Sequence, residues 1–386
     1  MKKHHRHMKA ILIAATVLSV LLALATIPFF LSLHATHAST AQQNQDTGAM
    51  TTLNGLVHSS VVGSTQFIVD KAGHTVSVDA NPYDVQIVPA LQANAQNGLL
   101  QAGDLVATNI GGQDTGRTLV VFPAGVGPAH QFNSASSAFS GLAKEAFNAQ
   151  TGTDWVTNFS KNNVEIFNTN GVRINTVTSY HFHKPWGIAS NGGRANPKAK
   201  SIGSFFVANA GTATIDRIDI VLVNGAATFK VSSIAQLSSS GTETKIALTW
   251  APTFKIKNTQ YADVLLALDP VNNRVAAFPD STTTTQYADQ GVTAFQGKPL
   301  NNPGGIALNP FNDDLLVVNL NDNNLLELNA NEGTVVGTRL VDTVPVDLQT
   351  GNGSALFGVT ASKDRAGNLV IYFTDDNTNT VDMLSI

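Results

Sequence analysis

Cysteine is absent from the 386 residues, and charged residues are scarce. Without cysteine the chain forms no disulfide and carries out no thiol chemistry. Only 13% of the residues are charged, whereas long amphipathic helices usually carry more Glu, Lys and Arg on their solvent side. Because Gly, Asn and Thr are abundant instead, the composition favours an all-β domain.

The sequence also argues against a serine hydrolase or phosphate-loop enzyme and against a nucleic-acid-binding protein. The sequence holds no Gly-x-Ser-x-Gly nucleophile motif and no glycine-rich phosphate loop with its lysine. Residues 1–38 carry four of the positive charges and no acid, so the formal charge of −4 leaves −8 on the remainder. An acidic domain is a poor electrostatic partner for nucleic acid, and we expect no nucleic-acid partner.

The N-terminus has the pattern of an export segment. A basic stretch at residues 1–9 precedes an apolar run at residues 10–33, which is long enough to cross a bilayer. The small residues around Ala38 suit a signal peptidase, so residues 1–38 are predicted to be a signal peptide or, if uncleaved, an N-terminal membrane anchor. Residues 39–50 are polar and predict a flexible spacer before a domain at residues 51–386.

One stretch of that domain has the pattern of four short strands. The apolar runs at residues 305–308 and 314–318 are joined by an Asn- and Pro-containing turn, which predicts an antiparallel hairpin. Residues 325–328 and 334–340 predict a third and a fourth strand. Such a unit cannot bury both faces alone, so it must stack against copies of itself.

Copies of this four-stranded unit are visible in the spacing of the residues that end each second strand. The second strand of each unit ends in Asn or Asp, and the first apolar residue of the third strand follows six positions later. These pairs are Asn158 and Val164, Asn209 and Ile215, Asp269 and Val275, Asn319 and Leu325, and Asp375 and Val381. Asn109 is a sixth such mark, with a longer turn before Leu119. Four strands per period of about fifty residues predict a β-propeller, and six marks predict six blades.

The last unit contains only three strands, at residues 357–361, 369–373 and 380–386. Propellers commonly complete the last sheet with an N-terminal strand, which leaves no open edge. Strand-like pieces occur at residues 55–62, 66–69 and 75–78, and residues 75–79 are predicted to close the ring because they directly precede blade one. Blade four is predicted to begin its first strand at Pro252.

The first strands begin with patterns such as Pro185-Trp186-Gly187-Ile188 and Pro303-Gly304-Gly305-Ile306, which resemble NHL-type repeats. More narrowly, Asn81-Pro82-Tyr83-Asp84-Val85 followed by Gly103-Asp104-Leu105-Val106 is similar to a family of secreted bacterial NHL-like proteins without an established role. The resemblance covers residues 80–386. It implies a six-bladed propeller of four-stranded blades but no particular chemistry.

Similar six-bladed propellers include calcium-dependent lactonases and zinc-dependent lyases, whose ligands gather at the central channel. His181 and His183 are two positions apart on an extended segment and would project the same way, with His130 as the third partner that could complete a zinc site. They could equally be polar residues at the start of a blade. The Asn- and Asp-rich turns at residues 319–324 and 375–379 offer oxygen ligands for Ca²⁺, although these residues are also ordinary turn formers.

Two functions follow from this sequence. We favour an exported, monomeric, non-enzymatic propeller, secreted or anchored at the cell surface, that binds an extracellular protein or glycan with no cofactor. Membrane contact would then be limited to the N-terminal segment. The alternative is a metal-dependent hydrolase or lyase that uses Ca²⁺ or Zn²⁺ at the channel, and in that case the candidate ligands are His181, His183 and His130.

Overall fold

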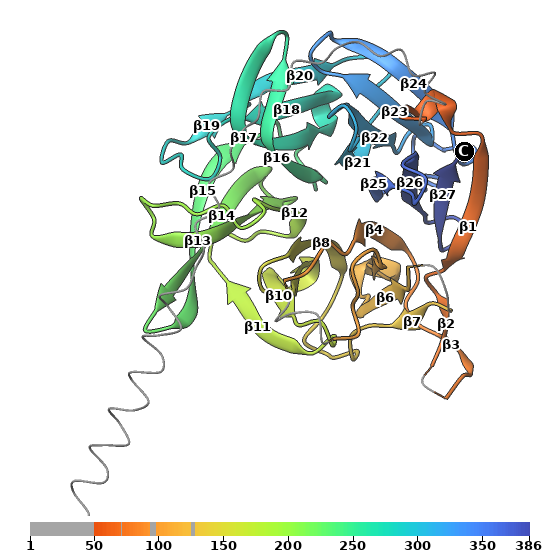
Figure 1. Cartoon of the computed structure of the whole chain (residues 1–386), viewed down its shortest axis with the longest axis horizontal. Coiled ribbons are helices and arrows are strands. Elements are labelled where there is room, and N and C mark those ends of the chain that lie inside the picture. Colours follow the sequence, from red (N-terminus) through yellow and green to blue (C-terminus); the bar gives the residue numbers. More distant parts are fainter. Residues whose placement is uncertain (1–49, 71, 93–97, 125–127) are drawn as a thin grey trace, which may run out of the picture. The chain divides into compact units, whose positions relative to one another are not determined.

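The computed structural model describes residues 50–386 except residues 71, 93–97 and 125–127. The predicted export segment and nearly all of the predicted spacer lie outside the described residues. The described residues form six small, mainly antiparallel sheets, which are arranged as the blades of a six-bladed β-propeller (Figure 1), and one separate two-stranded hairpin. The predicted fold class and blade count are therefore confirmed.

The first three blades follow one another along the chain. Blade one contains β4 (Pro82–Ile87), β5 (Leu105–Asn109), β6 (Thr118–Phe122) and β7 (His130–Gln131). Blade two contains β8 (Leu142–Asn148), β9 (Thr153–Asn158), β10 (Asn163–Phe167) and β11 (Arg173–Thr178). Blade three contains β12 (Pro185–Ser190), β13 (Ser201–Asn209), β14 (Thr214–Val223) and β15 (Ala226–Gln236), and β19 (Ala288–Asp289) adds a fifth, parallel strand.

The last three blades complete the ring. Blade four contains β16 (Leu248–Ile256), β17 (Thr259–Asp269), β18 (Arg274–Phe278) and β20 (Val292–Gln296). Blade five contains β21 (Pro303–Leu308), β22 (Leu315–Asn319), β23 (Asn324–Asn329) and β24 (Thr334–Leu340). Blade six contains β25 (Val359–Lys363), β26 (Leu369–Asp375), β27 (Thr380–Ser385) and β1 (His58–Ser64).

Helical structure in the described part is limited to short 3₁₀ turns. These are η1 (Leu53–Gly55), η3 (Gly112–Asp114), η4 (Phe159–Lys161) and η5 (Pro270–Asn272). None of the described helices has the length and apolarity that crossing a bilayer requires.

An N-terminal strand does close the ring, but it is not the predicted one. Strand β1 pairs with β27 along its length, from His58 opposite Ser385 to Ser64 opposite Thr380. The predicted closing strand became β3 (Thr75–Ser77), which forms a separate hairpin with β2 (Phe67–Val69). A local turn favours that hairpin, since one Asp70 carboxylate oxygen accepts the backbone N–H groups of Ala72 and His74.

Blade four also begins earlier than predicted. Strand β16 starts at Leu248, so Pro252 lies inside it rather than at its start. β16 is the inner edge strand of its sheet, where a residue without a backbone N–H is tolerated.

The predicted marks have one structural role. Asn109, Asn158, Asn209, Asp269, Asn319 and Asp375 are each the last residue of the second strand of their blade. In three blades the mark's Oδ1 accepts the backbone N–H two residues before the first strand: Ser140 to Asn158 at 2.8 Å, His183 to Asn209 at 2.9 Å and Asn301 to Asn319 at 3.0 Å. The side chain thus ties the start of the first strand to the end of the second.

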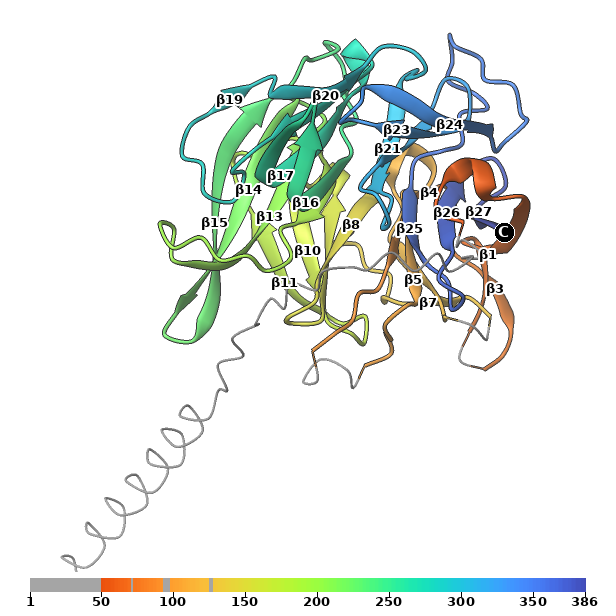
Figure 2. The same cartoon turned by 45° about the horizontal axis from the view of Figure 1, so that its top comes forward.

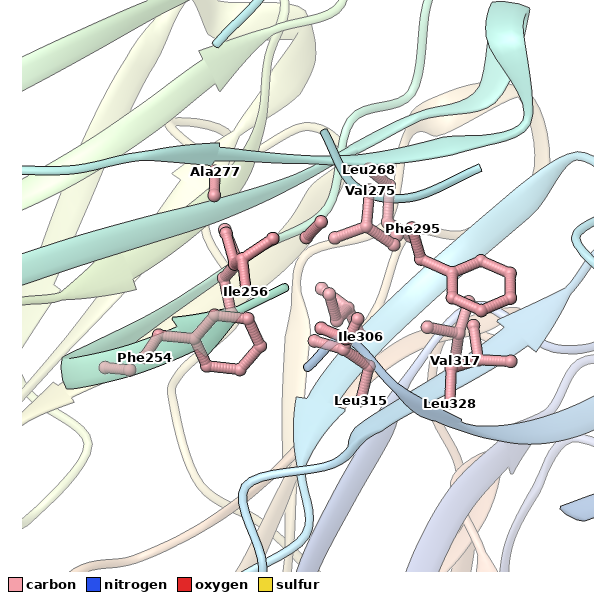
Figure 3. Packing of buried hydrophobic residues seen from close by; sticks show 14 of the residues in the cluster. Phe254, Ile256, Leu268, Val275, Ala277, Phe295, Ile306, Leu315, Val317 and Leu328 are labelled. Atoms are coloured by element: carbon pink, nitrogen blue, oxygen red, sulfur yellow. The ribbon is translucent and has the colours of Figure 1, made fainter. Parts of the chain in front are cut away.

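The core lies between the blades. Each of the six junctions has its own cluster of buried apolar side chains, including the junction of blades six and one, to which Val381 of β27 and Ile68 of β2 contribute. Figure 3 shows the junction of blades four and five, where Phe254 and Ile256 of β16 face Ile306 and Leu315. Burial of apolar surface at about 25 cal/mol per Å² therefore holds neighbouring blades together without disulfides.

Candidate functional site

The inner strands β4, β8, β12, β16, β21 and β25 surround the propeller axis (Figures 1 and 2). Counting from the mark at the end of each second strand, the pairing registers give equivalent positions in all six blades. The start of the inner strands defines one end of the channel, which we call the mouth.

Aromatic rings close the channel at the mouth. Tyr83, Trp186 and Phe357 come from the first-strand starts of blades one, three and six. Tyr83 stacks on Phe357 with ring centroids 3.8 Å apart, and it meets Trp186 edge-on at 5.4 Å. Phe159 of η4 packs against the other side of Trp186 at 5.6 Å. Burial raises the pKa of Tyr83, so its hydroxyl stays neutral and can act as a hydrogen-bond donor.

Blade four contributes a lysine to this cluster instead of an aromatic ring. Lys245, in the connection between β15 and β16, places its ammonium 4.7 Å from the Trp186 ring, 5.2 Å from Tyr83 and 5.7 Å from Phe357. Such cation–π contacts are worth about 0.5–2 kcal/mol. Burial lowers the pKa of Lys245, and nearby carboxylates oppose that shift.

Three carboxyl groups on different loops interact electrostatically with Lys245 and raise its pKa. Asp114 belongs to blade one, Asp376 to blade six, and Glu243 to the same connection as the lysine. Burial raises the pKa of Asp376 to about 7, against the opposing effect of Lys245. Glu243 also forms an ion pair with Lys184. The mouth therefore carries both signs of charge above an apolar floor.

A hollow of about 660 Å³ opens at this end. Its walls are Lys184, Gly211, Gly241, Thr242, Glu243 and Lys245. Lys245 belongs both to these walls and to the aromatic cluster, so the hollow adjoins the cluster and suits a ligand that rests on the mouth.

The opposite end of the channel has a smaller hollow, lined by polar as well as apolar residues. All six inner strands line a hollow of about 250 Å³, which also includes Glu145 and Trp250. The indole N–H of Trp250 donates to Asp263 at 2.9 Å and is therefore already engaged.

Charged side chains are buried between blades one and two near this channel. Asp84 of β4 and Lys144 of β8 lie 3.4 Å apart, and Lys144 also donates to the backbone carbonyl of Phe357. Burial raises the pKa of Asp84 and lowers that of Lys144, while their pairing opposes both shifts. In the other four blades the equivalent residues are small: Gly187, Ala247, Gly305 and Gly358.

A second carboxyl pair lies beside this ion pair. Burial raises the pKa of Glu145 well above its usual value and that of Asp154 to about 8, and the two carboxyl groups influence each other's protonation. No described side chain donates a hydrogen bond to their carboxyl oxygens, so the pair keeps a proton at neutral pH. Glu145 occupies the position of Val85, Ile188, Leu248, Ile306 and Val359 in the other blades. Asp154 occupies the position of Leu105, Phe205, Leu265, Leu315 and Ile371.

The three candidate histidines are divided between two blades. His181 and His183 lie just before β12. Burial raises the pKa of Asp216, and both histidines oppose that shift. Ser233 donates to Asp216 at 2.5 Å, and its hydroxyl lies 3.1 Å from Nδ1 of His181. His130 is on β7, the outer strand of blade one. Within the described part no three or more His, Asp or Glu side chains are arranged to hold a metal ion.

The Asn- and Asp-rich turns join neighbouring blades. Asn162, Asn273, Asn323 and Asn379 adopt a left-handed backbone conformation with φ between 45° and 56°. The Oδ1 atom of each accepts a backbone N–H of the segment that leads into the next blade, from Lys184, Asn302, Ala355 and Asn81 respectively. These side chains already have protein partners, which gives the turns a structural role.

Solved structures with a similar fold are propellers of distant sequence. A catalytically inactive virginiamycin B lyase from Staphylococcus aureus, solved with quinupristin, is 12% identical with a TM-score of 0.46, over 80% of this chain and 96% of that one. An auxiliary nutrient binding protein from Bacteroides thetaiotaomicron is 10% identical with a TM-score of 0.53, over 84% of this chain and 75% of that one. No family model matches the chain, and no curated protein matches it. At these identities the likeness concerns the fold alone.

Sequence reasoning missed the main features of both channel ends. Tyr83, Trp186 and Phe357 were visible as residues at the starts of first strands, but the sequence gives no sign that they meet. Lys245 lies in a connection without periodicity. Asp154 did carry a signal, because it stands four residues before its mark, where the other five blades have a large apolar residue.

Proposed function

We propose that this chain is exported and serves as a non-enzymatic binding propeller, with an extracellular glycan or protein held at the mouth. The observation that carries this proposal is an open, charged hollow at the mouth, which shares Lys245 with the buried aromatic cluster. A ligand can contact Lys184, Glu243 and Lys245 there without entering the channel. The rings of the floor position Lys245, whose ammonium has no hydrogen bond or ion pair to a described residue.

The mouth suits binding for a further physical reason. Its walls come from turns of blade three and from the connection between blades three and four, and loops on a rigid scaffold are the usual place for recognition residues. The ammonium of Lys245 offers a donor, and the backbone carbonyls of Gly211 and Gly241 offer acceptors, at this hollow. The carboxylate among the residues that line the hollow, Glu243, is already paired with Lys184, which suits a charged binding surface.

Binding can be tested on a printed array of bacterial and host glycans, with a panel of purified extracellular proteins measured in parallel. The test variant Thr242→Ala/Glu243→Ala changes the mouth, and the control Thr249→Ala/Thr360→Ala changes the opposite hollow. We expect saturable binding by the wild type and the control, and at least a tenfold loss for the mouth variant. Equal loss in both variants would contradict binding at the mouth, and absence of any saturable ligand would contradict the binding role.

A metal-dependent hydrolase or lyase is the second candidate function, and the Glu145–Asp154 pair is the observation that favours it. A carboxyl group that keeps its proton at neutral pH can act as a general acid. Glu145 is among the residues that line the hollow at the end of the channel opposite the mouth. Elemental analysis of the purified protein separates the two functions. One Ca²⁺ or Zn²⁺ per chain, together with chelator-sensitive turnover of lactones, would favour the enzyme.

A further inference from the structure

Blades three and four depart from the four-stranded repeat, and the departure builds a cavity. The connection after β18 leaves blade four, runs over blade three and adds β19 as a parallel fifth strand beside β15. Together with the loop between β12 and β13, it covers the face of the long β14–β15 hairpin (Figure 2). The space enclosed is a cavity of about 210 Å³, away from both ends of the channel.

A buried arginine forms the floor of this cavity. Arg217 of β14 is only 5% exposed, and its Nε donates to Asp219 at 3.1 Å. Its Nη1 donates to the backbone carbonyls of Ser281 and Thr284 at 3.0 and 2.8 Å. The second amino group, Nη2, makes no hydrogen bond to a described residue, so a charged donor group remains free in a side chain that lines the cavity.

Two lysines add to the positive charge. Lys198 from the β12–β13 loop and Lys230 from β15 line the cavity, and neither ammonium pairs with a carboxylate in the described part of the chain. The acid that lines the cavity, Asp219, is already engaged, because its second oxygen accepts the hydroxyl of Ser204 at 2.7 Å. The cavity is therefore cationic within a domain that is otherwise acidic.

The loops that hold these groups are fixed by polar contacts. Asn191 and Asn196 donate to Thr282 from the β12–β13 loop, and the Asp263 carboxylate accepts both the backbone N–H and the hydroxyl of Thr282. A preorganised set of donors loses little entropy when a ligand binds. The side-chain hydroxyls of Ser232 and Thr285 complete the donors that line the cavity.

We propose that this cavity binds a phosphate or sulfate group, with Arg217 Nη2, Lys198 and Lys230 as the charged donors. The donors come from three sides: the sheet, the β12–β13 loop and the β18–β19 connection. Such a distribution fits the oxygens of a tetrahedral oxyanion better than the two oxygens of a planar carboxylate. Charge-assisted hydrogen bonds to anions are about twice as strong as neutral ones, and arginine favours such groups.

The proposal can be tested by calorimetric titration of the purified protein with inorganic phosphate, inorganic sulfate, glucose 6-phosphate, glucose 6-sulfate and acetate. The test variant is Lys198→Ala/Lys230→Ala, which removes two exposed cations from the cavity. The control Lys255→Ala/Lys257→Ala removes two exposed cations elsewhere and keeps the net charge of the two variants equal. Thermal melting of each variant confirms that it is folded.

We expect the wild type and the control to bind a phosphate or sulfate compound with a dissociation constant below about 1 mM, and the test variant to bind it at least about tenfold more weakly. An ester that binds about tenfold more tightly than the inorganic ion would identify an organic ligand, whereas equal affinities would identify the free anion. Acetate binding as tight as phosphate, equal losses in both variants, or no saturable binding would each overturn the proposal.

Discussion

Replacement of one buried carboxyl group should stabilise the protein in a pH-dependent way. Asp154 is fully buried, and its folded pKa is raised from 3.8 to about 8 by burial. Between these two values the unfolded chain loses a proton that the folded chain keeps, so the free energy of unfolding falls as pH rises. Asn at this position has the same shape and cannot ionise.

The size of this stabilisation follows from the raised pKa of Asp154. At pH 7 the unfolded Asp154 is about three pH units above its pKa, and each unit corresponds to about 1.4 kcal/mol. The upper limit is therefore about 4 kcal/mol, and because Glu145 shares the proton we expect Asp154→Asn to gain about 1–4 kcal/mol at pH 7. At pH 4 the gain should fall below about 1 kcal/mol, since the folded Asp154 is then protonated and the unfolded Asp154 is close to its pKa.

Urea denaturation of the wild type and of Asp154→Asn between pH 4 and pH 8 measures this difference. Asp263→Asn is the matched control, because that buried carboxylate accepts hydrogen bonds from Trp250 and Thr282 and should lose stability on substitution. Asp154→Asn with lower stability than the wild type throughout the range, or a gain that does not change with pH, would refute the shared-proton account.

Three further predictions concern the ring and the mouth. A chain that starts at residue 65 lacks β1 and should melt at a clearly lower temperature than one that starts at residue 51, as followed by circular dichroism; equal midpoints would mean that β1 does not close the ring. Asn323→Ala should lower the free energy of unfolding by about 1–3 kcal/mol in urea, because the backbone N–H of Ala355 loses its acceptor, and a change below about 0.5 kcal/mol would count against the inter-blade role. Lys245→Met should raise the pKa of Asp376 above about 7, since Lys245 lowers it, and carboxyl ¹³C NMR would show an unchanged value if the two groups do not interact.

The sequence predicts the blades well because the fold dictates their repeated residues. A mark such as Asn158 must hold the start of the first strand, and the apolar residue six positions later, Val164, is fully buried at a blade junction. The buried apolar residue recurs in every blade and the hydrogen bond from the mark in three of them, so the pattern leaves a period. The same logic predicts four strands per unit from the apolar runs around Asn319.

The sequence does not predict contacts that occur in one place only and do not repeat from blade to blade. Three N-terminal pieces have similar strand character, and the choice of β1 depends on pairing with β27, more than 300 residues away. The position of Lys245 over three rings depends on an irregular connection, and the cavity at Arg217 depends on a loop that crosses between blades. Periodicity carries no information about such features.

Hydrogen–deuterium exchange of the protein with its strongest array ligand is the most direct test of binding at the mouth. If the ligand binds at the mouth, backbone amide hydrogens exchange more slowly in the connection that carries Gly241 to Lys245 and in the segment around Lys184. Protection confined to the opposite end, around residues 86–89, 145–147 and 188–190, would contradict it.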